Sequence, residues 1–517
     1  MAAPSNTLTG TTGNDILSGP GSVATLVQGL SGNDTITLAT NGDWAQAGAG
    51  NDIIRLSTAS TITSFAGSIV GGDGNDSFAV SGGTLVNGAN IGLNAGSDTI
   101  TITGGSIINS TLGAGAGNDT ITLSSASVTT SFVNSGDGAD TINLSGTTFA
   151  SSTLQAGKGQ DRIVVGSAVF DSTSFVGLGE GTDSITFTAA FGAGTLAGGG
   201  LADTITFGGT IGAVAVYGDA DGVTTEGTGT GGAADGADKI SFSANTFTAA
   251  TSVYGAGGND TITFAGGAGG VLLNGGDGAD QLLASGAALT GAFTVDGGAG
   301  LDTITLGGVT GPTALVLGGL GTDSITVVSA AGAFVAGSIN GGDGNDTISF
   351  TNSSVSAAGF SALGTVNGGA GVDKITFNTT GVFTDIDLAN ITATVAQSAG
   401  TILNAVYEAG DSLVLGTGLG ALTTVNFALG GPQVFVSNSG SFSSLDTAAV
   451  GSVGVFDSGD DLVIGVVTVT GSSILFVNVV NGDDMLKTTA VGSLNYAASN
   501  FGFTLAQSGG ALTITFS

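Results

Sequence analysis

A short glycine- and aspartate-rich phrase recurs along most of this chain and is followed each time by alternating apolar residues. The best copies read Gly-Gly-Asp-Gly-Asn-Asp at 71–76 and 341–346, and Gly-Gly-Asp-Gly-Ala-Asp at 275–280. Most copies are 18 to 24 residues apart, with one gap of 35 between Asp203 and Asp238. A fixed period of this kind predicts a repeat architecture, in which each unit buries its apolar face only against its neighbours.

The residues after each motif aspartate alternate between polar and apolar, as in Asp119-Thr-Ile-Thr-Leu and Asp260-Thr-Ile-Thr-Phe. Such alternation predicts a strand with one buried face. A second short apolar stretch precedes the next glycine cluster, for example Ser131-Phe-Val, so each unit reads turn, strand, turn, strand. We therefore predict an all-β fold: a parallel β-solenoid of about 17 coils over residues 1–384.

After Lys374 the repeat fades, and residues 385–517 are predicted to form a smaller, β-sandwich-like region for assembly and secretion. Segments that read as strands there are Leu413–Leu415, Gln433–Val436, Leu462–Val469, Ile474–Val480 and Leu512–Phe516. The acid pairs Asp460-Asp461 and Asp483-Asp484 are interpreted as turns that end strands rather than as catalytic dyads.

The charged residues exclude several classes of function. Six Lys and Arg stand against 39 Asp and Glu, which gives a formal charge of −33, and the chain contains no His and no Cys. Catalytic triads that contain histidine, metal sites with thiolate ligands, and disulfide bonds are therefore excluded. The negative charge argues against nucleic acid and anionic membranes as partners. No apolar run is long enough for a membrane span, and the N-terminal residues do not resemble a cleaved signal peptide.

The motif aspartates predict a file of divalent cations. Stacking the coils brings each aspartate within about 5 Å of the next, where like charges repel by several kcal/mol at an intermediate dielectric. Carboxylate and carbonyl oxygens, with no nitrogen or sulfur ligand in the chain, favour Ca²⁺ over transition metals. The alternative is that the aspartates only bond to backbone groups in turns. The predicted ligands are Asp15, Asp34, Asp52, Asp76, Asp98, Asp119, Asp140, Asp161, Asp183, Asp203, Asp238, Asp260, Asp280, Asp302, Asp323, Asp346 and Asp373, with further acids at the third motif position, Asp73, Asp137, Asp277 and Asp343.

These motifs resemble the glycine-rich, calcium-binding repeats of the RTX (repeats-in-toxin, hemolysin-type) family. The resemblance rests on Gly10-Thr-Thr-Gly-Asn-Asp-Ile-Leu-Ser-Gly19 and on the copies at 71–76 and 341–346, and it covers residues 8–380. It implies a right-handed β-roll whose turns hold Ca²⁺, type I secretion through a C-terminal signal, and folding in external calcium. The chain departs from the family pattern, because it has one clear calcium loop per coil instead of two. The copies at 93–98 and 198–203 are imperfect.

Three functions from different classes were compared. The favoured one is a secreted, calcium-dependent structural protein that assembles with itself, head to tail or as a lattice, into a cell-surface layer or an extracellular filament, with cell-surface polysaccharide as a further partner. It resembles surface-layer and filament proteins built from such repeats, because the repeats leave no room for a separate effector domain. The alternative is an adhesin or ligand-binding surface protein, including one that binds ice. It is based on pairs of outward threonines two residues apart, such as Thr120/Thr122 and Thr204/Thr206, which resemble those of ice-binding solenoids. An enzyme is not expected, because the few Lys and Arg supply little basic catalysis.

Overall fold

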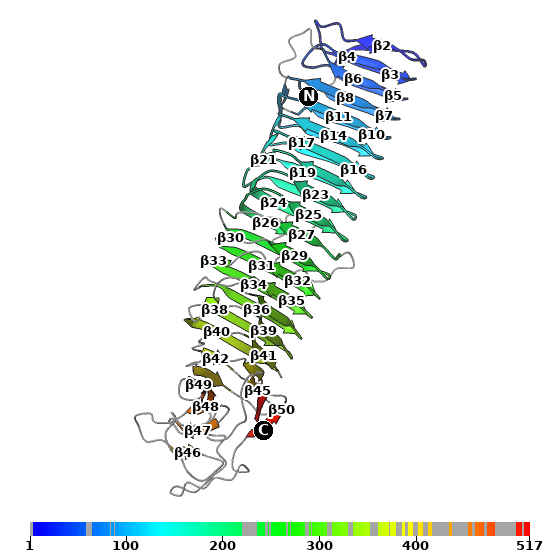
Figure 1. Cartoon of the computed structure of the whole chain (residues 1–517). Coiled ribbons are helices and arrows are strands. Elements are labelled where there is room, and N and C mark those ends of the chain that lie inside the picture. The colour runs from blue at the N-terminus through cyan, green and yellow to red at the C-terminus, as the bar shows by residue number, and fades with distance from the viewer. Residues whose placement is uncertain are drawn as a thin grey trace. The chain divides into compact units, whose positions relative to one another are not determined.

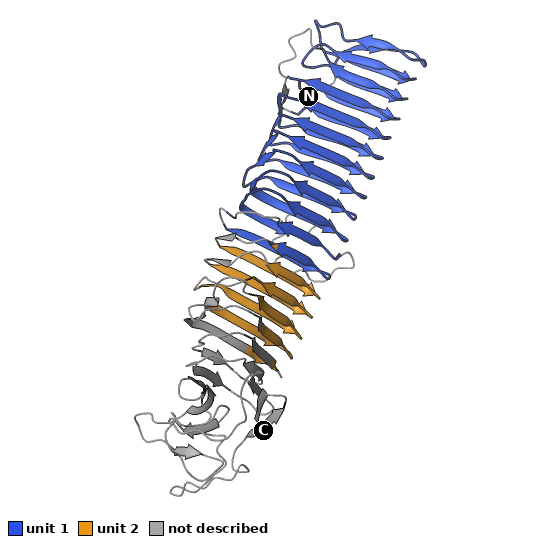
Figure 2. Cartoon of the chain, viewed as in Figure 1, with its two compact units in different colours: residues 1–263 blue, residues 264–517 orange. Residues whose placement is uncertain are grey.

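The computed structural model describes residues 4–57, 65–82, 84–86, 88–219, 235–242, 247, 250–264, 267–268, 270–284, 289–290, 292–307, 313–328, 334–351, 360–371 and 373–378, together with the C-terminal strands named below. The described residues form strands and turns, and none of them lies in a helix. The chain divides into two compact units, Met1–Thr263 and Phe264–Ser517 (Figure 2).

Unit 1 is a stack of parallel strands, and each motif aspartate stands directly before one of them (Figure 1). The strands that follow the aspartates are β2 (Ile16–Ser18), β4 (Thr35–Leu38), β6 (Ile53–Leu56), β8 (Ser77–Ser81), β11 (Thr99–Thr103), β14 (Thr120–Ser124), β17 (Thr141–Ser145), β20 (Arg162–Val165), β23 (Ser184–Phe187), β25 (Thr204–Phe207), β27 (Lys239–Phe242) and β29 (Thr261–Phe264).

A second parallel sheet of unit 1 is built from the apolar stretches that lead into the glycine loops. Its strands are β1 (Asn6–Thr9), β3 (Thr25–Ser31), β5 (Trp44–Ala49), β7 (Ser68–Asp73), β10 (Asn90–Ala95), β13 (Thr111–Ala116), β16 (Phe132–Asp137), β19 (Thr153–Lys158), β22 (Phe175–Glu180), β24 (Phe191–Gly200), β26 (Ile211–Tyr217) and β28 (Thr251–Gly257). A third, narrow parallel sheet joins β9 (Thr84–Val86), β12 (Ser106–Ile108), β15 (Ser127–Thr129), β18 (Thr148–Ala150) and β21 (Val169–Phe170).

The parallel pairing places equivalent residues of successive turns beside one another. Ile100 of β11 pairs with Ile121 of β14, which pairs with Ile142 of β17, and all three are fully buried. Phe207 stacks on Phe187 with ring centroids 4.9 Å apart and on Phe242 with centroids 4.7 Å apart. A single turn could not bury these side chains, so the core is made by stacking.

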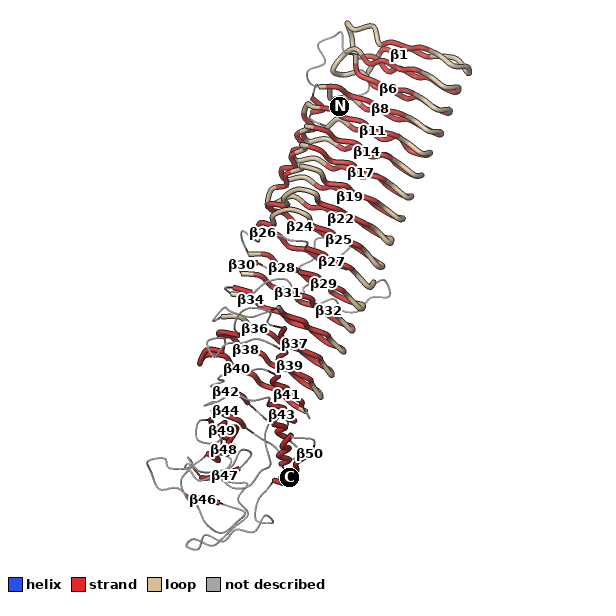
Figure 3. The backbone as a smooth tube through the Cα atoms, in the orientation of Figure 1, coloured by secondary structure: helices blue, strands red, loops and turns tan. Residues whose placement is uncertain are grey.

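Unit 2 begins with the same arrangement (Figure 3). Strands after motif aspartates are β32 (Gln281–Ala284), β35 (Thr303–Leu306), β37 (Ser324–Val328), β39 (Thr347–Thr351) and β41 (Asp373–Asn378), and the parallel pairing continues into β43 (Ile391–Val395) and β45 (Ser412–Leu415). The companion sheet contains β31 (Val271–Gly278), β34 (Phe293–Gly300), β36 (Leu315–Gly321), β38 (Phe334–Asp343), β40 (Phe360–Ala370) and β42 (Asp385–Asp387), and β30 (Gly267–Ala268) pairs with β33 (Leu289–Thr290).

Antiparallel pairing appears only near the C-terminus of the described chain. The strand β51 (Ala511–Phe516) pairs with β45 and with β50 (Phe503–Ser508). A five-stranded sheet joins, in order, β44 (Ile402–Val406), β49 (Ser473–Val480), β48 (Asp461–Val469), β47 (Val453–Asp457) and β46 (Val434–Val436). The strand segments expected in this region are therefore present, whereas the linking residues that would define a β-sandwich lie outside the described residues.

The predicted all-β class and parallel β-solenoid are confirmed, and the second residue after the aspartate is buried in most turns, whereas Leu17 is half-buried. The expected division between residues 384 and 385 stays a prediction. The parallel pairing itself runs past this point into β45, although the glycine–aspartate motif ends earlier.

Candidate metal-binding aspartate ladder

The glycine loops hold each motif aspartate at the start of a strand. At the end of β7 and in the loop that follows it, Gly72 and Gly74 have positive φ angles of 127° and 124°. A Cβ atom on Gly72 would collide with the carbonyl oxygen of Gly48 in the neighbouring turn. Only glycine therefore permits both this backbone shape and this close stacking of turns, and Asp76 follows at a fixed place.

We call the stacked motif aspartates the aspartate ladder of each unit: Asp15 to Asp260 in unit 1 and Asp280 to Asp373 in unit 2. Apart from Asp15, which is half-buried, their exposed fractions lie between 0 and 2%. A buried carboxylate is costly unless it is bonded or neutralised. The partners of its two oxygens therefore decide what the ladder can do.

In most turns one carboxylate oxygen of the ladder aspartate accepts a hydrogen bond from the neighbouring turn. The backbone N–H of Asp76 donates to Oδ1 of Asp98 at 2.7 Å, and the N–H of Asp98 donates to Oδ1 of Asp119 at 2.7 Å. In unit 2 the N–H of Asp302 donates to Oδ1 of Asp323 at 2.8 Å. These bonds run between turns, so they differ from the local turn bonds that the sequence offered as the alternative to metal binding.

The other oxygen, Oδ2, is buried and has no hydrogen-bond partner through most of both ladders. This holds for Asp34, Asp52, Asp76, Asp98, Asp119, Asp140, Asp161, Asp183, Asp203, Asp238, Asp302, Asp323, Asp346 and Asp373. Buried polar atoms are rarely left without a partner, and each such case calls for a ligand, a proton or a water molecule. Asp15 differs, because its Oδ2 accepts from the Thr11 N–H at 2.5 Å and the Thr11 hydroxyl at 2.9 Å.

In the turns with glycine five residues before the aspartate, Oδ2 lies beside that glycine and near a carbonyl oxygen of the next turn. A Cβ on Gly297 would lie 2.6 Å from Oδ2 of Asp302 and would also clash with the carbonyl oxygen of Gly318. The same arrangement occurs at Gly318, next to Oδ2 of Asp323 and the Gly341 carbonyl. A carboxylate oxygen and a carbonyl oxygen thus meet in a cradle that only glycine leaves open. In other turns the equivalent residue is larger, as with Leu93 and Leu178.

Burial makes these carboxylates hard to ionise. It raises the pKa of Asp76, Asp119, Asp161, Asp302 and Asp346 to about 7, and backbone N–H bonds only partly oppose this effect. The largest increases are at Asp203 and Asp238, where burial raises the pKa to about 9 and about 8. At neutral pH the ladder therefore needs either protons or cations.

The oxygen atoms of the ladder fit a hard cation. Most turns supply a carboxylate oxygen without a hydrogen-bond partner together with glycine-loop carbonyls, which are the ligands that Ca²⁺ prefers. The described residues contain no group of three or more acidic side chains that could hold a metal by themselves. Backbone carbonyls would therefore supply much of the coordination, with one or two aspartates for each ion.

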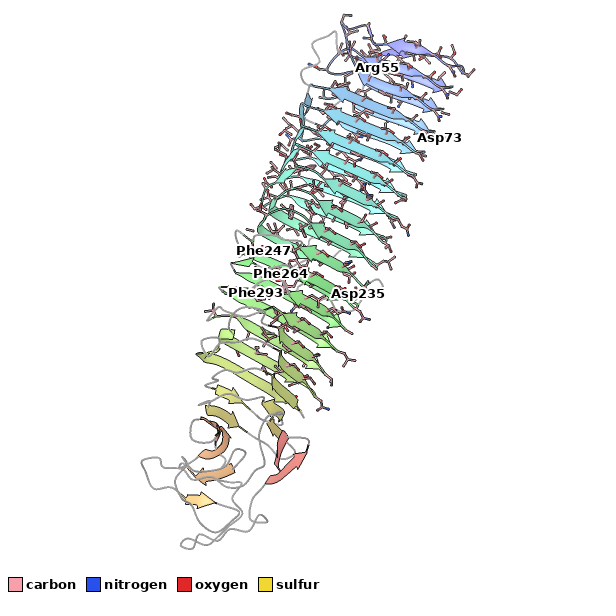
Figure 4. The ribbon with its side chains drawn as sticks, viewed as in Figure 1. Arg55, Asp73, Asp235, Phe247, Phe264 and Phe293 are labelled. Carbon is pink, nitrogen blue, oxygen red and sulfur yellow. The ribbon has the colours of Figure 1, made fainter. Side chains whose placement is uncertain are left out.

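The acids at the third motif position are separate from the buried oxygens. Asp73, Asp137, Asp277 and Asp343 are exposed, and Figure 4 shows Asp73 at the loop edge of the stack. Their charge can still affect the buried carboxylates. Burial is the main cause of the raised pKa of Asp76, and the negative charge of Asp73 is a smaller one. The structure brings the ladder aspartates together along each unit and leaves these four at the surface.

Two acids that the sequence did not single out as ligands lie beside the ladder. Asp219 accepts hydrogen bonds from the N–H groups of Gly236 at 3.0 Å and Gly257 at 3.3 Å. Oδ2 of Asp235 is buried without a hydrogen-bond partner. Asp235 stands three residues before Asp238, at the third motif position where the sequence also places other acids, whereas Asp219 was marked only by the unusual gap between Asp203 and Asp238.

Neither the models of known protein families nor the curated proteins match this chain. Membership of the RTX family therefore stays a prediction that rests on the motifs. In the part of the chain that the structure describes, no helix has the length and apolar character needed to cross a membrane.

Proposed function

We propose that this protein is a secreted, calcium-dependent structural protein that assembles with itself into a cell-surface layer or an extracellular filament. The observation that carries the proposal is the aspartate ladder, with its buried and unpartnered Oδ2 atoms beside glycine carbonyls. Calcium would neutralise the ladder and hold successive turns together. Folding would then depend on the high calcium concentration outside the cell.

The regular stack also supports a structural role. Its turns repeat one arrangement of short strands and loops, and a β-solenoid is typical of structural proteins. Strand β1 pairs with β3 and strand β2 with β4, and the described residues supply no strand for their outer edges. An open strand edge is a template for pairing with another chain. A second copy of this protein is the partner that we propose.

Imaging the purified protein by electron microscopy, with millimolar CaCl₂ and with a chelator, tests this function. Ordered layers or filaments that form with calcium and disperse on chelation are expected. A protein that stays monomeric at high concentration in calcium, as judged by light scattering, would reject the structural role.

The second candidate is an adhesin or ligand-binding surface protein, including one that binds ice. One observation favours it: threonine side chains form outward-facing rows on the strands that follow the aspartates. Thr99, Thr120 and Thr141 are register partners on adjacent strands. The rows are interrupted by cations, since Arg55 pairs with Thr37 and bonds to its hydroxyl at 3.3 Å. Thermal hysteresis measurements would test the ice-binding form of this candidate.

A further inference from the structure

The outward face of the second sheet of unit 1 carries aromatic and uncharged polar side chains that have no role in the proposed function. Along strands β16 to β28, two outward positions of each strand line up from turn to turn. These positions are occupied by Phe132 and Asn134, Thr153 and Gln155, Phe175 and Gly177, Thr195 and Ala197, Ala215 and Tyr217, and Ser252 and Tyr254. We call this surface the aromatic face. None of its residues is charged, although the chain has a net charge of −33.

The phenylalanines at the first outward position recur at every second turn, whereas the tyrosines at the second outward position follow one another on adjacent turns. Phe132 is on β16, Phe175 is two strands further on β22, and Tyr217 is two strands beyond that on β26. Successive strands of a sheet are about 4.8 Å apart, so the rings of Phe132 and Phe175, which share one register position, follow one another at about 9.6 Å. The turn between Phe132 and Phe175 carries Thr153 and Gln155, which offer a hydroxyl and an amide.

Phe175 lies flat on the sheet. A Cβ on Gly177 would lie 2.9 Å from Cε1 and 3.3 Å from Cζ of Phe175, and 3.7 Å from Cγ of Gln155. Gly177 is accordingly buried, although it occupies an outward position. A ring that covers a glycine keeps its other face available, and the amide-bearing side chain of Gln155 lies next to it.

The two tyrosines extend this surface. Their rings stack with centroids 5.0 Å apart and planes inclined by 9°. Both side chains are half-buried, so each is held in place while part of it remains open to solvent. Stacking fixes the positions of two phenol groups, each of which can donate and accept a hydrogen bond.

The opposite sheet of the same turns lacks this pattern. The outward residues of β17 to β29 are Thr141 and Asn143, Arg162 and Val164, Ser184 and Thr186, Thr204 and Thr206, Lys239 and Ser241, and Thr261 and Thr263. They include two cations and no aromatic residue. The aromatic face is therefore a local feature of one sheet and does not follow from the repeat.

We propose that the aromatic face binds an uncharged polysaccharide chain that runs along the stack of turns. Sugar rings present apolar C–H faces that pack on aromatic rings, while their hydroxyls bond to amide and hydroxyl side chains. The spacing between Phe132 and Phe175 is comparable to the length of a disaccharide unit in an extended chain. The lack of charge fits a neutral glycan, whereas nucleic acid requires a basic surface. A second protein would be expected to meet a more continuous apolar patch than this alternation of rings and polar groups.

This inference deepens the proposed function, because an extracellular glycan partner rests on the protein being secreted. Its test is separate from assembly. The purified full chain, with calcium, is run in native gels that contain hydroxyethyl cellulose, galactomannan, dextran or anionic alginate. We expect at least one neutral polymer to retard the protein, and alginate to leave its mobility unchanged.

The double variant Phe132→Leu/Phe175→Leu keeps the face apolar and removes two ring faces. Its affinity for the retarding polymer should fall about tenfold, since each aromatic contact is worth about a two- to tenfold change. The matched control is Thr186→Val/Thr206→Val on the opposite sheet, which should bind as the unaltered protein does. Circular dichroism checks that all the proteins are folded.

Three results would overturn the proposal. The first is that no neutral polymer retards the protein, and the second is that a polymer retards the two double variants equally. The third is that the leucine variant sediments with a lower coefficient than the unaltered protein. The last result would identify the face as a contact between copies of the chain. Calcium-dependent layers without glycan binding would reject this inference alone, whereas glycan binding without layers would reject the structural role alone.

Discussion

Asn substituted for a ladder aspartate should have opposite effects on stability with and without calcium. In Asp302, Oδ1 accepts from the Asp280 N–H at 2.8 Å, while Oδ2 is buried without a partner. Asparagine keeps the Oδ1 acceptor and removes the charge. Its amide N–H₂ group would lie near the Gly318 carbonyl oxygen and could donate a hydrogen bond to it, whereas a carboxylate oxygen there can only repel it.

The size of the effect follows from the ionisation cost. Burial raises the pKa of Asp302 from 3.8 to about 7. At pH 8 the carboxylate is ionised, and a difference of about 3 pKa units corresponds to about 4 kcal/mol of lost stability. In the presence of a chelator, Asp302→Asn should therefore raise the free energy of unfolding by up to about 4 kcal/mol. In millimolar calcium it should lower stability, because a charged ligand is lost.

Urea unfolding at pH 8, followed by far-ultraviolet circular dichroism with and without calcium, measures both effects. The control is Asp277→Asn, because Asp277 is exposed near the end of β31 in the same unit, and it should change stability by less than about 0.5 kcal/mol. Equal changes for Asp302→Asn in both conditions would refute the argument that the buried charge is what calcium relieves.

The other predictions concern calcium, pH and the core. Removing calcium at pH 8 should sharply lower the urea concentration at which half of the protein is unfolded, and a chelated sample that keeps the midpoint of the calcium-bound protein would contradict the calcium assignment. Because burial raises the pKa of Asp76 and Asp346 from 3.8 to about 7, the folded metal-free protein binds these protons more tightly than the unfolded chain does. The stability of the metal-free protein should therefore be highest below about pH 4 and fall as the pH rises through about 7. Thermal unfolding across this pH range measures the effect. A melting temperature that does not change with pH would contradict the reasoning. Phe207→Ala should cost about 3 to 5 kcal/mol, because the ring is fully buried between Phe187 and Phe242, whereas the outward Thr206→Ala should change little in the same urea titration.

The sequence alone determined the fold class and the position of the candidate site. Alternation after Asp119 and Asp260 defined strands with one buried face, because side chains on a strand point to opposite sides. The regular return of the glycine loops required those strands to stack in parallel, since a single unit has too little apolar surface to fold. The identity of the ladder aspartates followed from the same repeat.

Only the tertiary structure decided how the two oxygens of each aspartate are used and which acids remain at the surface. The bond from the Asp76 N–H to Oδ1 of Asp98 joins residues 22 positions apart, and no local pattern specifies it. The exposure of Asp73 and the burial of Asp76 depend on which side of the loop faces the next turn. The aromatic face likewise exists only because stacking aligns Phe132, Phe175 and Tyr217, which are far apart in the sequence. Properties carried within one turn can be predicted from a repeat, whereas properties created between turns depend on register and packing.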